Sequence, residues 1–160
     1  MERKKQNRSI LLGILIIVIV IIATTGCGFY NLLTADDFKK EWGAIGYTVV
    51  DTETPEYDTY KRKAYMEASK EDVPFKISFY ELENETEAQK LYKKYKDNLV
   101  NYLTTSSKNT ETTGAVFSKT IAVSDQEYIV ISRVKNTIIF IPGLKEHKKI
   151  IDDMLEHVKY

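Results

Sequence analysis

The side chains that most often carry out acid–base or metal chemistry are few in this sequence. His147 and His157 are its two histidines, and on one helix their spacing turns them about 80° apart. No carboxylate is placed to complete a metal site with them, so a solvent-exposed helix face accounts for both. The sequence therefore predicts neither a metal site nor a cofactor.

A nucleophile for covalent catalysis is also missing from the sequence pattern. Ser132 and Lys135 match the Ser-x-x-Lys spacing of penicillin-binding proteins, but the companion Ser-Asp-Asn and Lys-Thr-Gly motifs are absent. We interpret the match as a strand that runs into a turn, and we predict no catalytic residue. The alternative is an enzyme subunit whose active site is completed by a partner.

Aromatic and basic residues provide the first candidate for ligand binding. The chain has 11 tyrosines, and Tyr65, Tyr80 and Lys76 fall on the polar face of two neighbouring predicted strands. Such surfaces bind glycans, peptides or anionic polymers, and tyrosine is enriched at interfaces. The alternative is that tyrosine suits an exposed strand simply because of its β-propensity.

Arg133 is the second candidate for ligand binding, because it shares a strand face with Ile129 and Ile131. A guanidinium in that position is partly desolvated, so it either recognises a ligand or forms a buried structural ion pair. The ion pair is the interpretation that the pattern favours. We keep Arg133 beside the tyrosines as a candidate ligand-binding residue.

The single cysteine, Cys27, offers the most specific chemistry in the chain. It follows a basic segment at residues 1–9 and an apolar stretch at residues 10–23, which together are built like an export signal. The letters ATTGC at residues 23–27 resemble a bacterial lipobox, in which cleavage falls directly before the cysteine. That resemblance implies that the thiol of Cys27 carries a diacylglycerol. Thr24 departs from the pattern, which usually has leucine there.

A lipid on Cys27 would also explain why an exported protein keeps one cysteine, since a free thiol can pair with other chains. Two acyl chains supply the stable anchoring that a single chain does not. The alternative is an uncleaved signal-anchor of a single-pass structural or regulatory subunit, because residues 9–30 are long enough to span a bilayer. Both interpretations leave the basic residues in the cytoplasm and the body outside.

The charge distribution argues against a nucleic-acid partner. The chain has 23 basic and 23 acidic side chains, whereas nucleic-acid-binding proteins usually carry a clear basic excess. The basic excess is confined to residues 1–9, and the body after Cys27 is slightly acidic. The partners that we expect are the membrane and, beyond it, another envelope protein or a wall polymer.

Periodicity predicts one extracytoplasmic domain at residues 34–160, after a signal peptide or membrane anchor at 1–26 and a short tether at 27–33. We expect an α+β fold in the order αβββ-αβββ-α, with helices packed on an antiparallel sheet of about six strands. The polar stretch 104–114 is predicted to be a loop. The predicted helices cover 34–45, 84–103 and 145–158, and the predicted strands cover 47–50, 62–69, 74–82, 115–123, 127–134 and 137–141.

Several short motifs of the body resemble those of small uncharacterised lipoproteins of Gram-positive bacteria. They are Phe38 followed by GYTVVD at 46–51, ISFY at 77–80, and SRVKNT at 132–137 before a final helix. Together with the lipobox they cover most of the exported body. The resemblance implies an address on the outer face of the cytoplasmic membrane and supports the fold, and it brings no activity with it.

Overall fold

The computed structural model describes residues 30–53, 59–103 and 107–160 of the chain. The predicted signal segment and Cys27 therefore lie outside the described residues. Within the described ranges, no helix is both long and apolar enough to cross a membrane. The helices are α2 (Ala35–Ala44), α3 (Glu85–Asp97) and α4 (Lys148–His157), and short 3₁₀ turns η1 (Leu99–Tyr102) and η2 (Lys145–His147) adjoin the last two.

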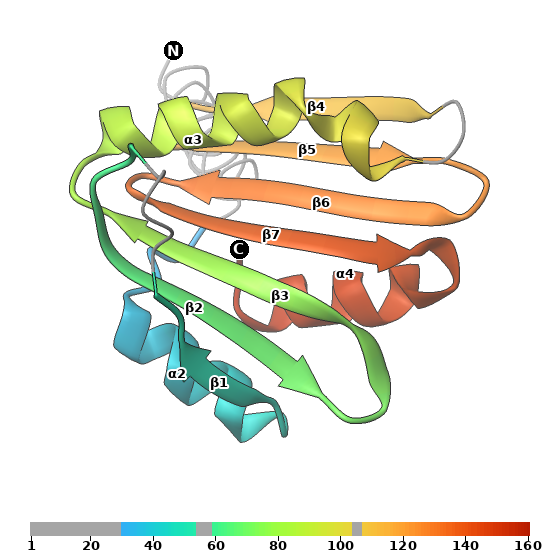
Figure 1. Ribbon diagram of the computed structural model, residues 1–160, viewed down its shortest axis with the longest axis horizontal. Helices are drawn as coiled ribbons and strands as arrows, with labels where there is room; N and C mark the ends of the chain where they lie inside the picture. Colours follow the sequence, from blue (N-terminus) through green and yellow to red (C-terminus); the bar gives the residue numbers. More distant parts are fainter. Residues whose placement is uncertain (1–29, 54–58, 104–106) are drawn as a thin grey trace, which may run out of the picture.

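Seven strands form one antiparallel sheet in the order β1-β2-β3-β7-β6-β5-β4 (Figure 1). The predicted α+β class is therefore confirmed, and the strands predicted at 62–69 and 74–82 are present as the antiparallel pair β2 and β3. The sheet has one more strand than predicted. The strands are β1 (Thr48–Asp51), β2 (Arg62–Lys70), β3 (Val73–Leu82), β4 (Lys108–Thr113), β5 (Phe117–Val123), β6 (Glu127–Val134) and β7 (Thr137–Leu144).

The additional strand is β4, which lies inside the stretch predicted to be a loop. Every residue of β4 is exposed, so the sequence has no alternation of apolar and polar residues from which a strand could be recognised. The strand forms because its backbone pairs with β5 from Lys108 opposite Val123 to Thr113 opposite Ser118. Its threonines also favour the extended conformation.

The first helix begins and ends where its sequence predicts. Thr34 caps it, with its hydroxyl accepting from the Asp37 amide while the Asp37 carboxylate accepts from the Thr34 amide, which is a reciprocal capping box. At the other end Gly46 has φ of 88°. The Tyr47 amide then donates to the Trp42 carbonyl at 3.0 Å, as in a Schellman motif.

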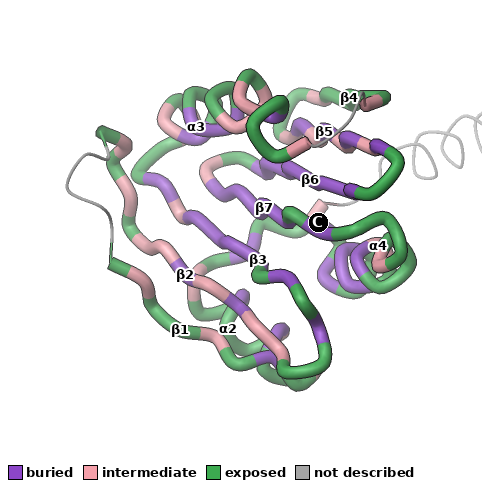
Figure 2. Tube along the Cα trace, turned by 45° about the vertical axis from the view of Figure 1, so that its right-hand side comes forward, coloured by how far each residue is buried: buried purple, intermediate pink, exposed green. Residues whose placement is uncertain are grey.

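The helices cover both faces of the sheet (Figure 2). Apolar residues of α2 and α4 belong to the larger buried cluster, and those of α3 belong to a second cluster on the opposite face. The predicted order αβββ-αβββ-α is wrong in its second half, because four strands, β4 to β7, follow α3. The two halves meet where β3 pairs with β7. Because α2 and α3 lie on opposite faces, the halves are not two copies of one unit related by a simple rotation.

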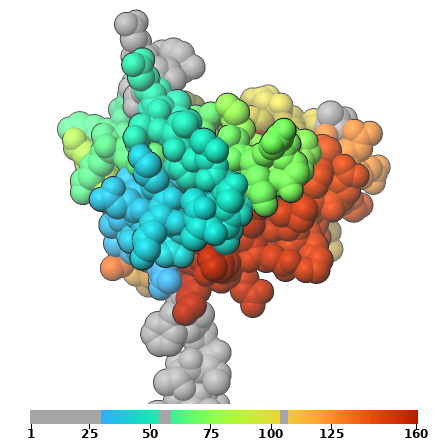
Figure 3. Space-filling model, turned by 90° about the horizontal axis from the view of Figure 1, so that it is seen from below, coloured from blue at the N-terminus to red at the C-terminus, as the bar shows by residue number. Residues whose placement is uncertain are grey.

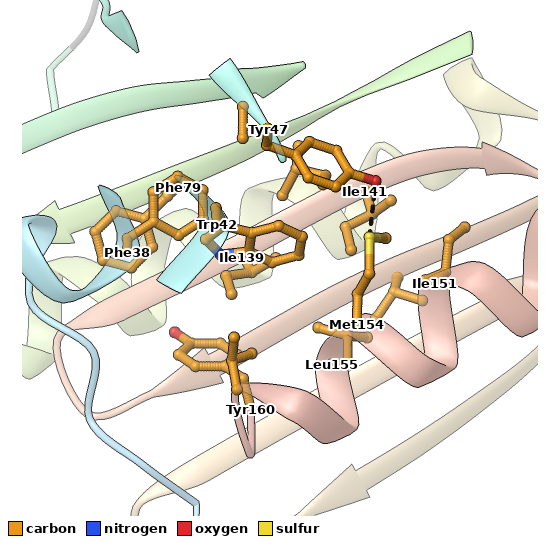
Figure 4. Packing of buried hydrophobic residues seen from close by; sticks show 14 of the residues in the cluster. Phe38, Trp42, Tyr47, Phe79, Ile139, Ile141, Ile151, Met154, Leu155 and Tyr160 are labelled. Carbon is orange, nitrogen blue, oxygen red and sulfur yellow. Dashed lines mark hydrogen bonds between the residues drawn. The ribbon is translucent and has the colours of Figure 1, made fainter. Parts of the chain in front are cut away.

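The larger cluster connects α2 and α4, which lie side by side on one face of the sheet (Figure 4). Phe38 and Trp42 from α2 are fully buried, and the Phe38 ring stacks on Phe79 of β3 at 4.6 Å. The Tyr47 hydroxyl donates to the Met154 sulfur at 2.9 Å, and burial raises the pKa of that tyrosine. This packing holds α4 and α2 in fixed positions on the same face.

Candidate functional site

Three of the four predicted ligand-binding residues lie in one row across the sheet, on the face that carries α3. Tyr65 of β2 pairs with Tyr80 of β3, and Tyr80 pairs with Ile138 of β7. Ile138 in turn pairs with Arg133 of β6. The shared face follows from the alternation of side chains along each strand. The three predicted residues of this row differ in how accessible they are.

Tyr80 is a core residue, which corrects the expectation that its ring is exposed. It is only 3% exposed, and its ring stacks on Tyr65 with centroids 4.6 Å apart. The Arg62 guanidinium lies 4.7 Å from the centre of the Tyr80 ring, and the Tyr80 and Tyr95 hydroxyl oxygens are 2.6 Å apart. Burial raises the pKa of Tyr80. Its role is to support Tyr65.

Tyr65, by contrast, is half-buried, and Glu67 links it to Lys76. Its hydroxyl donates to one carboxylate oxygen of Glu67 at 2.9 Å, and the Lys76 ammonium donates to the other oxygen at 2.9 Å. The hydrogen bond from Lys76 lowers the pKa of Glu67, while burial opposes that shift. The Lys76 side chain is 65% exposed. This Tyr65–Glu67–Lys76 array is the accessible part of the predicted site.

Arg133 forms a structural ion pair, as the sequence favoured, but only the arginine is buried, because its partner Glu85 is 41% exposed. The Arg133 side chain is 4% exposed, and one guanidinium nitrogen lies 2.9 Å from the Glu85 carboxylate at the start of α3. The guanidinium also donates to the Lys135 carbonyl at 3.1 Å and to the Ser118 hydroxyl at 3.3 Å. These contacts hold the first turn of α3 on the sheet, and they leave Arg133 without access to a ligand.

Aromatic residues from three other elements extend the site, and the sequence did not assign them to it. We define the aromatic cluster by rings that contact one another in series. Tyr95 of α3 stacks on Phe140 of β7 at 4.6 Å, and Tyr102 of η1 meets the same Phe140 ring edge-on at 5.2 Å. Tyr95 and Tyr102 belong to the apolar face of the helix predicted at 84–103. Nothing in the sequence indicated that this helix would cross the sheet above Tyr80. The aromatic cluster comprises Tyr65, Tyr80, Tyr95, Tyr102 and Phe140.

The site can bind a ligand through aromatic stacking and charged hydrogen-bonding groups. Burial, with smaller effects from Tyr80 and Glu67, raises the pKa of Tyr65, so its hydroxyl stays protonated at neutral pH and acts as a donor. Across the described ranges, no group of three or more histidine, cysteine, aspartate or glutamate side chains is arranged to hold a metal ion. The two histidines lie apart, His147 at 3.8 Å from Glu146 and His157 at 3.8 Å from Glu41.

Comparison with known proteins adds no relative to this picture. No protein-family model, curated protein or solved structure matches the chain.

Proposed function

We propose that this chain is a lipoprotein of the outer face of the cytoplasmic membrane, whose domain binds a ligand and catalyses no reaction of its own. In this proposal a diacylglycerol on Cys27 anchors the chain, and the ligand contacts Tyr65 at the open edge of the aromatic cluster. The observation that carries the binding role is the half-buried Tyr65 ring, which is stacked on Tyr80 and bonded to Glu67. Such a ring is held in place before a ligand arrives, so little conformational entropy is lost on binding.

The chemistry of the array favours a hydroxyl-rich wall polymer as the ligand. An aromatic ring offers a flat apolar surface with a polar tip, against which a sugar ring can pack. The Glu67 carboxylate accepts and the exposed Lys76 ammonium donates, so hydroxyl groups on either side of the sugar would find partners. Binding sites commonly combine an aromatic surface with a few such polar groups. Another envelope protein is the second candidate ligand.

The anchor is tested by the intact mass of the protein extracted from its native membrane. We expect the loss of residues 1–26 and the gain of a diacylglycerol. The variant Cys27→Ala should keep residues 1–26, because cleavage depends on the lipidated cysteine. A full-length, unmodified mass would instead support the single-pass signal-anchor.

The binding role is tested by sedimentation of the protein with purified, insoluble cell wall. Tyr65→Ala should reduce the bound fraction, because it removes the accessible ring and the donor to Glu67. Ile150→Ala is the matched control, since Ile150 is an exposed apolar residue on α4, which packs on the other face of the sheet. Equal binding by both variants and the parent protein would contradict the proposed site.

A further inference from the structure

The first described residues are part of the folded domain and do not form a free tether. The Tyr30 ring stacks on Phe117 of β5 with centroids 4.0 Å apart. The Asn31 amide donates to the Lys159 carbonyl at 2.9 Å, and Leu33 is buried in the larger core cluster. The sequence predicted residues 27–33 as a tether, but Tyr30, Asn31 and Leu33 contact the body in this way.

This packing fixes how far the domain can lie from an anchor at Cys27. Two residues lie between Cys27 and Tyr30, so the two Cα atoms are three steps apart, and a fully extended chain spans at most about 11 Å over that distance. A domain with a packed first residue cannot turn freely about so short a connection. The surface around Tyr30 must therefore lie against the bilayer whenever Cys27 is held at the membrane interface.

We propose that this surface is a membrane-contacting surface of the protein, formed by Tyr30, Leu32, Val116, Lys135 and Lys159. Its occupant is the headgroup region of the phospholipid bilayer. The proposal rests on the membrane anchoring at Cys27 that is proposed above. Figure 3 shows that the first described residues and the end of the chain adjoin each other on the surface of the domain.

The contacts of these residues place them at one end of the sheet. Val116 precedes Phe117, on which Tyr30 stacks, and the Val116 carbonyl accepts from the Lys135 amide at 2.7 Å. Leu32 and Val116 are exposed apolar residues, at 41% and 42%. Exposed apolar residues beside an interfacial tyrosine suit the boundary between water and lipid headgroups.

The two lysines of the surface occupy backbone positions that do not favour lysine. Lys135 has φ of 50° and Lys159 has φ of 54°, which is the left-handed region where glycine or asparagine is less costly. Lys159 ends α4 at the position where glycine usually stands, since the following amide of Tyr160 donates to the Leu155 carbonyl. Both side chains are exposed. Ammonium groups at these positions can meet lipid phosphates, which gives the less favourable residue a function.

The membrane-contacting surface and the aromatic cluster lie on different faces of the sheet. Tyr30 packs on the cluster that α2 and α4 cover, whereas Tyr65 packs on the cluster beneath α3. Contact with the bilayer therefore leaves the Tyr65–Glu67–Lys76 array open to ligands beyond the membrane.

Depth-dependent fluorescence quenching tests this orientation on the full chain as it is processed in the cell. The lipid on Cys27 blocks the only native thiol, so an introduced cysteine can be labelled with a fluorophore at one position. Val116→Cys and Leu32→Cys report the proposed surface. Val100→Cys is the matched control, because Val100 is 73% exposed on η1, beside the second cluster. The vesicles contain phosphatidylcholine, phosphatidylglycerol and a phosphatidylcholine with a spin-labelled headgroup.

We expect the spin-labelled headgroups to quench the fluorophore at positions 116 and 32 and to leave the fluorophore at position 100 unchanged. Equal quenching at positions 116 and 100, or none at 116, would overturn the proposed surface while the anchor stands. The parent protein without an introduced cysteine distinguishes the two proposals. Labelling of that parent would reveal a free thiol at Cys27, and the proposed lipid anchor would fail.

Discussion

Tyr80→Ala should cost far more stability than Tyr65→Ala, although the two rings stack on each other. Tyr80 is 3% exposed in the cluster beneath α3, where truncation of a large aromatic side chain costs about 3–5 kcal/mol. Tyr65 is half-buried, so its truncation should cost about 1–2 kcal/mol. Tyr80→Phe removes only the hydroxyl that bonds Tyr95, and the loss should be about 1 kcal/mol.

The assay is urea unfolding followed by circular dichroism, with the free energy of unfolding extrapolated to water. The expected order of destabilisation is Tyr80→Ala first, then Tyr65→Ala, with Tyr80→Phe near the smaller loss. Similar small losses for both alanine variants would refute the reasoning, because they would mean that the Tyr80 ring contributes no more than a surface side chain. In that case both rings would be available to a ligand, and the division between a supporting and a contacting tyrosine would be wrong.

Three further predictions concern pH, the β6–β7 turn and the buried arginine. Burial raises the pKa of Tyr95 from 10 to about 12. The stability that the protonated Tyr95 contributes is therefore complete below about pH 10 and is lost as the pH rises through about 12. Urea unfolding midpoints and tyrosinate absorbance, followed across that pH range, measure this loss. Lys135→Gly should raise the free energy of unfolding by about 0.5–1 kcal/mol, because it relieves a left-handed φ of 50°, and a lower urea midpoint would contradict this. Glu85→Ala should lower the free energy of unfolding by about 1–3 kcal/mol, because it leaves Arg133 with neutral partners only. The control is Asp97→Ala, which breaks the exposed ion pair with Lys93 on the same helix. It should lower the free energy of unfolding by less than about 0.5 kcal/mol.

The parts of the fold that could be predicted are those in which one face of an element is buried. Residues 128–131 of β6 are apolar on both faces of the strand in the sequence, and all residues of β6 are buried between β7 and β5. The capping of α2 could be predicted because Thr34 and Asp37 interact within one turn. Local hydrogen bonds and burial periodicity leave a signal in the sequence that does not depend on distant partners.

The end of β7 was predicted wrongly for a reason that depends on its neighbours. Proline and glycine at residues 142–143 usually end a strand, yet β7 continues to Leu144. On one side of β7, Pro142 pairs with Ile129 of β6. On the other side, the pairing of β7 with β3 stops at Phe140. Proline is tolerated at such a locally open edge because no hydrogen bond from its nitrogen is needed.

The turn between β6 and β7 contains a similar difference. Asparagine tolerates a positive φ better than lysine does, but the left-handed residue of this turn is Lys135 and not Asn136. The Asn136 side chain instead donates to the Leu82 carbonyl at 2.9 Å, and its own carbonyl accepts from the Leu82 amide at 2.8 Å. Asn136 therefore fixes the end of β3, a contact between residues 54 positions apart that local turn preferences cannot indicate.

The candidate site was predictable as a face of the sheet but not as an accessible surface. Strand alternation predicted that Tyr65 and Tyr80 share a face, and their register pair agrees with it. That Arg133 lies on the same face follows from the pairing of β3 with β7 and of β7 with β6. Accessibility depends on where α3 crosses that face. Its first turn covers Arg133 through Glu85, and Tyr95 covers Tyr80. The order of the strands determines where α3 crosses the sheet. That order could not be inferred from periodicity, because periodicity does not indicate that β3 pairs with β7.

The strand order also determines how the anchor and the ligand site can act together. Phe117, which holds Tyr30, is on β5, and Tyr65 is on β2, four strand positions away. At about 4.8 Å per strand this is a separation of about 19 Å across the sheet, with the two sites on opposite faces. A long flexible tether would allow either face to meet the bilayer. The contacts of Tyr30, Asn31 and Leu33 with the domain remove that freedom. An anchor at Cys27 would therefore direct Tyr65 away from the lipid, towards the region where a wall polymer is found.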